Sequence, residues 1–219
     1  MLTKVVIIGA GGFAREVQDV IRNIGETRFY LVGFVDDFVE VGTSINGVPV
    51  LGDFSWFKTP EARGVSAVVG VGAPEVRRKL VLRLQEMGVP FATIVDPSII
   101  ASPFVTIGHG TVICPGVILT NNITIGNHVH LNLGSTVGHD AVIEDFTTTA
   151  PGVHINGHNY LKEGAYIGTG ANFNEGITVG EWSVIGSGAS VVRDIPANVT
   201  AVGCPAKVIK TREKGWYLS

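Results

Sequence analysis

The stretch "IGNHVHLNLGSTVGHDAVIEDF", residues 125–146, repeats an aliphatic residue at every sixth position. The same phase runs from residue 107 to residue 190 without insertion or deletion, and Thr149 and Phe173 are the exceptions among the first positions. The fifth position is small or β-branched almost throughout, and glycine stands second in six of the fourteen blocks. Neither a helix nor an amphipathic strand has a period of six, so the array predicts a hexapeptide-repeat parallel β-helix.

Three blocks of six complete one triangular coil, so residues 18 apart lie above one another at about 4.8 Å. One column therefore contains Asn121, His139, Gly157 and Glu175. His139 and Asp140 occupy the third and fourth places of their block, which puts them at an outward corner. The flat faces of such a coil favour a closed oligomer of identical chains.

Residues 1–98 show a different pattern, in which short apolar runs alternate with segments of helical period. Residues 4–9, 30–37, 66–72 and 90–96 read as strands, and 13–25 and 73–88 read as helices. Residues 45–53 read as a turn and an extended connection. In the second helix, the spacing places Val76, Leu80, Leu84 and Met87 on one face. This alternation predicts a small Rossmann-like α/β domain at 1–98, followed by the β-helix at 99–196 and a tail at 197–219.

The composition excludes several classes of partner. The net charge of the 219 residues is −3 and there is no block of basic residues, which argues against nucleic acid and anionic membranes. No apolar run approaches the roughly 20 residues of a membrane span, and the N-terminus lacks the pattern of a signal peptide. The two cysteines are far apart and form no CxxC motif, so a cytoplasmic location is expected.

The His139–Asp140 pair is the strongest candidate for chemistry. An imidazole supplies a general base near neutral pH, and an adjacent carboxylate can fix its tautomer. Gly157 follows His139 in the column, where a backbone N–H and the lack of a side chain suit an oxyanion and a close thioester. Together these residues form a set for acyl transfer. No cysteine lies near this centre, and Cys114 reads as a small buried residue.

The segment "GAGGFA", residues 9–14, follows a strand and precedes a helix, as in dinucleotide-binding domains. Gly9, Gly11 and Gly12 would let a diphosphate approach the helix N-terminus, and Asp36 or Asp37 would contact a ribose or base. NAD binding is one interpretation. Because only about 100 residues precede the repeats, a domain that binds a single nucleotide is the other.

A small α/β domain followed by a hexapeptide helix with "GHD" at its middle resembles the bacterial sugar acyltransferases of the NeuD-like and PglD-like group. These comprise N-acetyltransferases of nucleotide-linked 4-amino-sugars and sialic acid O-acetyltransferases. The resemblance implies a left-handed β-helix, a homotrimer with acetyl-CoA bound in grooves between subunits, and a nucleotide bound by the N-terminal glycines and aspartates.

The resemblance also implies roles for single residues. His139 matches the base, Asp140 its acidic neighbour, Asn132 a contact to the sugar amino group, and the Gly157 backbone a contact to the thioester carbonyl. The segment "GCPAK" resembles the border of the coenzyme A channel, which assigns Gly203, Pro205, Ala206 and Lys207. Two positions depart from the family pattern, because Phe13 and Thr148 stand where relatives often carry histidine.

The expected activity is direct, metal-free acetyl transfer from acetyl-CoA to a nucleotide-linked 4-amino-4,6-dideoxy-sugar for surface glycan synthesis, with Asn132 favouring an amine acceptor. O-acetylation of a sialic acid type of sugar is the alternative within the enzyme class. Outside it stand a zinc enzyme using His139, His154 and His158, and a non-catalytic nucleotide-sensing trimer. The tail is expected to pack on the helix end, cap its open edge or border the donor adenine.

Overall fold

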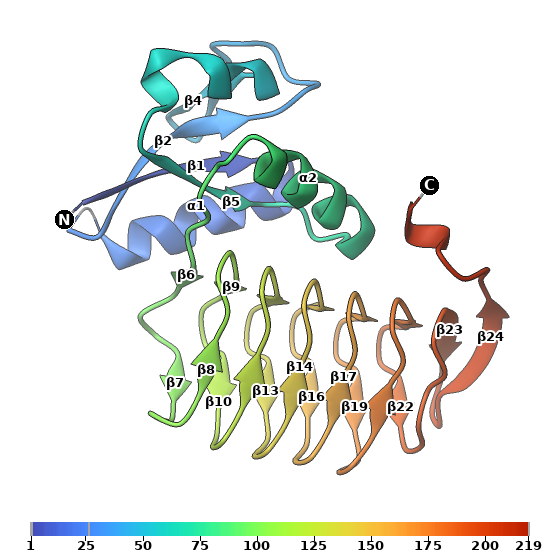
Figure 1. The fold of residues 1–219 in the computed structure, drawn as a ribbon. Helices are drawn as coiled ribbons and strands as arrows, with labels where there is room; N and C mark the ends of the chain where they lie inside the picture. The colour runs from blue at the N-terminus through green and yellow to red at the C-terminus, as the bar shows by residue number, and fades with distance from the viewer. Residues whose placement is uncertain (1, 26, 219) are drawn as a thin grey trace.

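Two units of different architecture follow one another in the computed structural model, which describes residues 2–25 and 27–218 (Figure 1). The sequence predicts an α/β domain followed by a long parallel β-helix, and both are present. The α/β domain lies against one side of the β-helix. Within the described ranges, no helix has the length and hydrophobicity needed to cross a membrane.

The N-terminal domain contains a mainly parallel sheet in the order β3-β4-β2-β1-β5. Its strands are β1 (Thr3–Ile8), β2 (Phe29–Val35), β3 (Ser44–Ile45), β4 (Val48–Gly52) and β5 (Val65–Val69). Its helices are α1 (Gly12–Ile24) and α2 (Pro74–Glu86), with 3-10 turns η1 (Phe54–Lys58) and η2 (Pro60–Ala62). The segment expected to be a turn and connection forms β3 and β4, an antiparallel hairpin that extends the sheet.

The segment 90–96, expected to be a further strand of this domain, divides between the two units. Phe91 forms an isolated bridge to Ala67 of β5. β6 (Ile94–Val95) instead pairs with the β-helix strand β9 (Val112–Ile113). The first coil of the β-helix therefore begins before the predicted boundary at residues 98 and 99.

The β-helix has three walls, and the chain visits them in turn. Wall 1 consists of β6, β9, β12 (His130–Leu131), β15 (Thr148–Thr149), β18 (Tyr166–Ile167), β21 (Val184–Ile185), β23 (Val199–Val202) and β24 (Lys207–Thr211). Wall 2 consists of β7 (Ile100–Ala101), β10 (Ile118–Leu119), β13 (Thr136–Val137), β16 (His154–Ile155), β19 (Asn172–Phe173) and β22 (Ser190–Val191). Wall 3 consists of β8 (Thr106–Ile107), β11 (Thr124–Ile125), β14 (Val142–Ile143), β17 (Tyr160–Leu161) and β20 (Thr178–Val179).

The places within each six-residue block have distinct physical roles. First-position residues such as Val137 and Ile143 are fully or almost fully buried and form a continuous core. Strand partners are 18 residues apart, as in Val137 with Ile155. The six second-position glycines lie against the next coil, where an added Cβ would approach its nearest neighbouring atom to between 2.3 and 2.6 Å. The second-position glycines therefore permit the coils to stack.

The fourth place of every block adopts left-handed backbone, a feature that the sequence pattern did not reveal. Glycine fills it in eight blocks, at residues 110, 116, 134, 152, 164, 170, 176 and 188. In the other six the residue is not glycine, at positions 122, 128, 140, 146, 158 and 182. Asparagine and aspartate adopt left-handed backbone more readily than other residues except glycine, so Asp140 suits its corner (φ +58°).

The C-terminal tail does two of the things expected of it. β24 pairs antiparallel with β23 and so covers the open edge of wall 1. The chain then returns to the α/β domain, where η3 (Trp216–Leu218) contacts α2 (Figure 1). Tyr217 stacks on Trp182 of the β-helix with ring centroids 3.8 Å apart. The tail thus links the far end of the β-helix to the N-terminal domain.

Arg77 makes the polar contact between the two units. Of the residues expected on one face of α2, Leu84 is buried and Leu80 and Met87 pack beside it, so only the expectation for Val76 is wrong. Val76 is 41% exposed, whereas Arg77 is fully buried. Its guanidinium donates to the carbonyls of Val71, Gly72, His128, Phe146 and Thr147 and to the Thr148 hydroxyl. Burial lowers the pKa of Arg77 to about 9, which leaves it charged at neutral pH. The buried guanidinium is tolerated because these acceptors, from the loop after β5 and from the β-helix, replace water.

Gly168 and Gly170, in the block at residues 167–172, allow two destabilising effects of substitution to be compared. One is the clash of an added side chain, and the other is left-handed backbone at a residue other than glycine. Gly170 has φ +67° and open space around it, whereas a Cβ on Gly168 would lie 2.6 Å from the Ser187 nitrogen. We expect Gly170→Ala to lower the free energy of unfolding by about 1 kcal/mol, Gly170→Asn by less, and Gly168→Ala by more than either. Urea denaturation of the three variants measures this order. Equal losses at the two positions would contradict it.

Arg77 and Arg78 provide a matched pair of buried and surface cations. Arg78 makes a partly exposed ion pair with Glu163 at 3.8 Å. We expect Arg77→Met to lower the free energy of unfolding by more than about 3 kcal/mol, because several buried carbonyls lose their donor. Arg78→Met should cost under about 1 kcal/mol. Denaturant titration distinguishes the two, and a mild effect of Arg77→Met would show that the joint does not depend on this side chain.

Candidate active site

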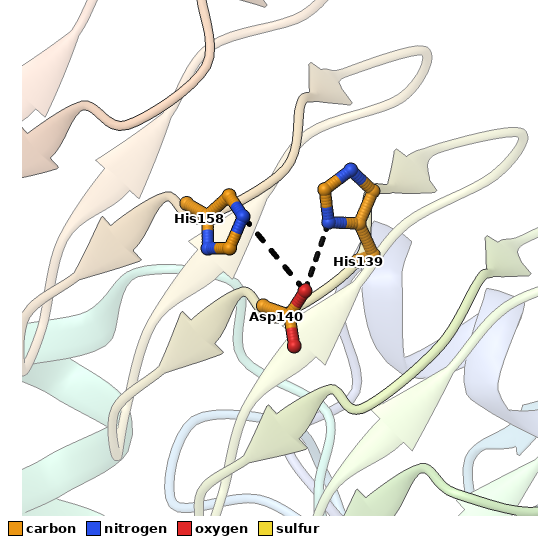
Figure 2. Close-up of side chains that lie close together, drawn as sticks. All are labelled: His139, Asp140 and His158. Carbon is orange, nitrogen blue, oxygen red and sulfur yellow. Dashed lines mark hydrogen bonds and ion pairs between the residues drawn. The ribbon is translucent and has the colours of Figure 1, made fainter.

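His139 and Asp140 occupy the corner between β13 of wall 2 and β14 of wall 3, and both side chains reach solvent (Figure 2). The His139 Nδ1 lies 2.9 Å from the Asp140 Oδ2. This hydrogen bond lowers the pKa of Asp140 from its usual value, with a smaller contribution from the Asn122 amide. Because an ionised carboxylate accepts only, Nδ1 carries the proton and Nε2 keeps its lone pair. The corner presents an oriented base.

Gly157 lies directly against the imidazole in the next coil. A Cβ on this residue would be 2.6 Å from the His139 Cε1 and 2.7 Å from Nε2. Any side chain here would displace the ring, so glycine is required for the observed position of His139. Gly157 is itself buried beside the ring, and the contact of its N–H to an oxyanion stays a prediction.

His158 and Glu175 extend the polar cluster into the next two coils. The His158 Nε2 lies 3.9 Å from the Asp140 Oδ2 and 3.8 Å from the Glu175 Oε1. The rings of His139 and His158 meet edge to face, with centroids 5.0 Å apart. His154, the other histidine considered for a zinc site, lies on β16 and contacts the Thr136 hydroxyl instead.

A cavity of about 590 Å³ lies on wall 1, between the α/β domain, the β-helix and the tail. Phe13, Asn132 and Thr148 of the predicted substrate contacts line it together. Their neighbours from the three parts of the chain include Glu16, Gly72, His130, Tyr166, Arg212 and Trp216. The structure therefore brings these predicted residues to one place, although that place is not the His139 corner.

The two positions that depart from the family pattern, Phe13 and Thr148, also take part in a packed network beside this cavity. The Phe13 ring packs against His130 with centroids 4.8 Å apart. The Thr148 hydroxyl accepts from Arg77 and donates to the Gly72 carbonyl. The Arg77 guanidinium also meets the His130 Nδ1 at 3.1 Å. Burial and the neighbouring cation hold the pKa of His130 well below its usual value, so this imidazole is neutral.

Part of the predicted nucleotide-binding set lies at a third place. Gly9, Asp36 and Asp37 line a cavity of about 200 Å³, whereas Gly11 and Gly12 line neither this cavity nor the one on wall 1. The Asp36 carboxylate accepts from the amides of Ala10 and Phe38 and so fixes the glycine loop. Asp37 accepts from Arg83 at 2.8 Å.

The segment 203–207 lies at the far end of the β-helix, between β23 and β24. It docks on β22 through two backbone hydrogen bonds, from Ser190 to the Gly203 carbonyl and from Ala206 to the Ser190 carbonyl. Gly203, Pro205 and Lys207 are exposed, and Ala206 is half-buried. Cys114, by contrast, is fully buried, and burial raises the pKa of its thiol to about 12, which excludes it as a nucleophile.

The order of the walls separates the base from the large cavity within one chain. Asn132 lies at the corner between β12 of wall 1 and β13 of wall 2, beside the cavity. His139 lies at the next corner, between walls 2 and 3, which is the edge opposite wall 1. The body of the β-helix therefore stands between the two.

Sequence reasoning missed Arg77, His130 and Trp216. The spacing of 18 does place His130 under Thr148 on wall 1, so their proximity could have been predicted. Arg77 gave no such signal, because the helical pattern assigned Val76 to the buried face. Trp216 reaches the cavity through a turn of the tail, which has no sequence period.

Three comparisons with known proteins place the chain among sugar acetyltransferases. Residues 4–84 match the model of the PglD N-terminal domain. GDP-perosamine N-acetyltransferase of Escherichia coli O157:H7 is 33% identical over 215 residues, covering 93% of this chain and 95% of that protein.

Solved structures of similar enzymes match nearly the whole chain. A variant of perosamine N-acetyltransferase from Caulobacter crescentus, in complex with CoA and GDP-perosamine, superposes with a TM-score of 0.88 at 32% identity, covering 94% of this chain and 96% of that one. The acetyltransferase domain of PglB from Neisseria gonorrhoeae FA1090, in complex with acetyl coenzyme A, gives a TM-score of 0.86 at 29% identity, covering 94% and 98%.

The resemblance inferred from the hexapeptide period and the "GHD" corner is confirmed, and so is the fold of a small α/β domain followed by a left-handed β-helix. The sequence identity extends over the α/β domain as well as the hexapeptide repeats. The chain belongs to the hexapeptide-repeat sugar N-acetyltransferases that include the GDP-perosamine enzymes.

Proposed function

We propose that this enzyme transfers the acetyl group of acetyl-CoA to the amino group of a nucleotide-linked 4-amino-sugar, with His139 as general base. The observation that carries the proposal is the oriented His139–Asp140 pair with Gly157 pressed against the ring. Family membership supports the reaction class, since the similar enzyme from Caulobacter crescentus was solved with CoA and GDP-perosamine.

The reaction is a single displacement. The amine nitrogen attacks the thioester carbonyl while the His139 Nε2 takes a proton from that nitrogen. The Gly157 N–H stabilises the resulting oxyanion, and Asp140 stabilises the imidazolium through Nδ1. The C–S bond then breaks, coenzyme A leaves as thiolate or thiol, and the amide product remains. Neither a metal nor a cysteine is needed in any of these steps.

The cavity beside Asp36 and the cavity on wall 1 together suggest how the acceptor nucleotide sugar lies. The loop after β5 contributes Val71 to the Asp36 cavity and Gly72 to the cavity on wall 1. A nucleotide held beside Gly9 and Asp36 would extend its sugar across this loop toward Asn132. Phe13 and Thr148 replace polar contacts with apolar packing and an occupied hydroxyl, so we expect the sugar to be held mainly by Asn132 and the tail.

A second chain completes this site. The amine beside Asn132 needs a base, and the His139 of the same chain lies at the opposite edge of the β-helix. A homotrimer, in which each cavity faces the His139 corner of a neighbour, satisfies both requirements. The donor would lie in the groove between chains, with its distal part beside residues 203–207.

An amine acceptor is favoured over a hydroxyl by Asn132 and by the similarity to perosamine N-acetyltransferases. We place the reaction in the cytoplasm, where acetyl-CoA and nucleotide sugars are available for glycan precursors. The sugar O-acetyltransferase alternative predicts transfer to a sialic acid instead. A panel of GDP-, UDP- and dTDP-linked 4-amino-sugars and of sialic acids, followed by thiol release and mass spectrometry, decides between them. Transfer to hydroxyl acceptors alone would contradict the proposal.

Replacing the base should abolish most of the turnover. We expect His139→Ala to lower kcat by about 10²–10⁴ with little change in acetyl-CoA binding, because proton transfer is lost while the donor groove stays intact. His154→Ala, an exposed histidine away from the corner, is the matched control and should keep its activity. Near-normal turnover of His139→Ala would remove this residue from the role.

Asp140 can be tested without disturbing its backbone. Asparagine tolerates the left-handed conformation of this corner, so Asp140→Asn removes the charge and leaves the turn intact. We expect kcat to fall by roughly 10–10³ and the unfolding midpoint to stay unchanged, since an amide neither fixes the required tautomer nor stabilises the imidazolium. Steady-state kinetics with thermal unfolding measure both. Unchanged kcat would show that Asp140 does not orient the base.

A further inference from the structure

The geometry points to an inhibitory zinc site at the catalytic corner, formed by His139, Asp140 and His158. The nitrogen and oxygen atoms that these side chains offer lie within 4.8 Å of one another (Figure 2). The binding step stands on these residues alone. Its consequence for catalysis rests on the proposed function of His139.

The distances require only small movements of exposed side chains. Zinc bonds of about 2.0–2.1 Å in a tetrahedron place the ligand atoms about 3.3–3.5 Å apart. The Asp140 Oδ2 lies 2.9 Å from the His139 Nδ1 and 3.9 Å from the His158 Nε2, on either side of that spacing. The three ligand atoms lie within 4.8 Å of one another, so the two imidazoles would have to turn toward a shared metal. All three side chains are 41–56% exposed and can rotate toward a common centre.

Two nitrogens and one carboxylate oxygen favour zinc over the hard cations. Magnesium and calcium prefer oxygen ligands throughout, whereas imidazole with carboxylate is a common zinc set. Glu175 lies 3.8 Å from the His158 Nε2 and supplies a fourth ligand within reach.

Zinc at this place would switch the tautomer of the base. Without metal, Nδ1 of His139 carries the proton and Nε2 keeps the lone pair that accepts the proton of the amine. When Nδ1 coordinates zinc, the proton of the neutral imidazole moves to Nε2, which then has no lone pair to offer. The base is lost although its ring remains in place. Inhibition should therefore lower kcat, and EDTA should restore it.

His158 makes the inference testable because it belongs to the zinc set and not to the acyl-transfer set. In His158→Gln the His139–Asp140 pair remains, so basal activity should stay within about threefold of the native enzyme. His154→Gln is the matched control, since it removes an exposed histidine outside the cluster. Equilibrium dialysis of the full-length protein with ZnCl₂, read by elemental analysis, measures binding without any substrate.

We expect about one tightly bound zinc per chain for the native protein and His154→Gln, and at least tenfold weaker binding for His158→Gln. In the thiol-release assay, the zinc concentration for half-inhibition should rise at least tenfold in His158→Gln. Equal zinc binding by His158→Gln and the native protein would overturn the site. Loss of activity on adding EDTA would overturn the inhibitory role. If no sugar is acetylated, dialysis still decides the binding step, so failure of the proposed function is distinguishable.

Discussion

Parallel pairing between strands whose residues align 18 positions apart is the constraint on which the rest of this structure depends. Each short strand pairs with the strands one coil below and one coil above, and every second-position glycine keeps the coils close enough to do so. The same register fixes the corners. It puts Gly157 against His139 and His158 beside Asp140, so the chemistry of the corner follows from the stacking of coils.

The three-walled cross-section is the physical reason for proposing a site shared between chains. Because wall 1 faces the α/β domain, the edge between walls 2 and 3 lies on the far side of the β-helix from that domain. The cavity proposed for the acceptor occupies wall 1, and the His139 imidazole occupies the edge between walls 2 and 3. Oligomerisation of identical chains is a direct way to bring these two surfaces together, because each chain carries one copy of both.

The period of six predicted much of this architecture, since buried first positions and stacking at 18 residues are strict consequences of the repeat. The corner pair His139 and Asp140 could be found for the same reason. The left-handed fourth position was missed because glycine fills only part of the set and residues such as Phe146 and Trp182 hide the pattern. Arg77 was missed because burial of a cation depends on carbonyls far away in sequence, which no local period records.

The central claim, that a base on one chain serves a cavity on another, is tested most directly by subunit mixing. His139→Ala lacks the base, and Asn132→Trp obstructs the cavity while keeping its own His139. If each variant alone is inactive, co-refolded mixtures should regain a substantial fraction of native activity, because some interfaces pair an intact corner with an intact cavity. Mixed oligomers that form but stay inactive would contradict the account, since they would show that base and cavity must belong to the same chain.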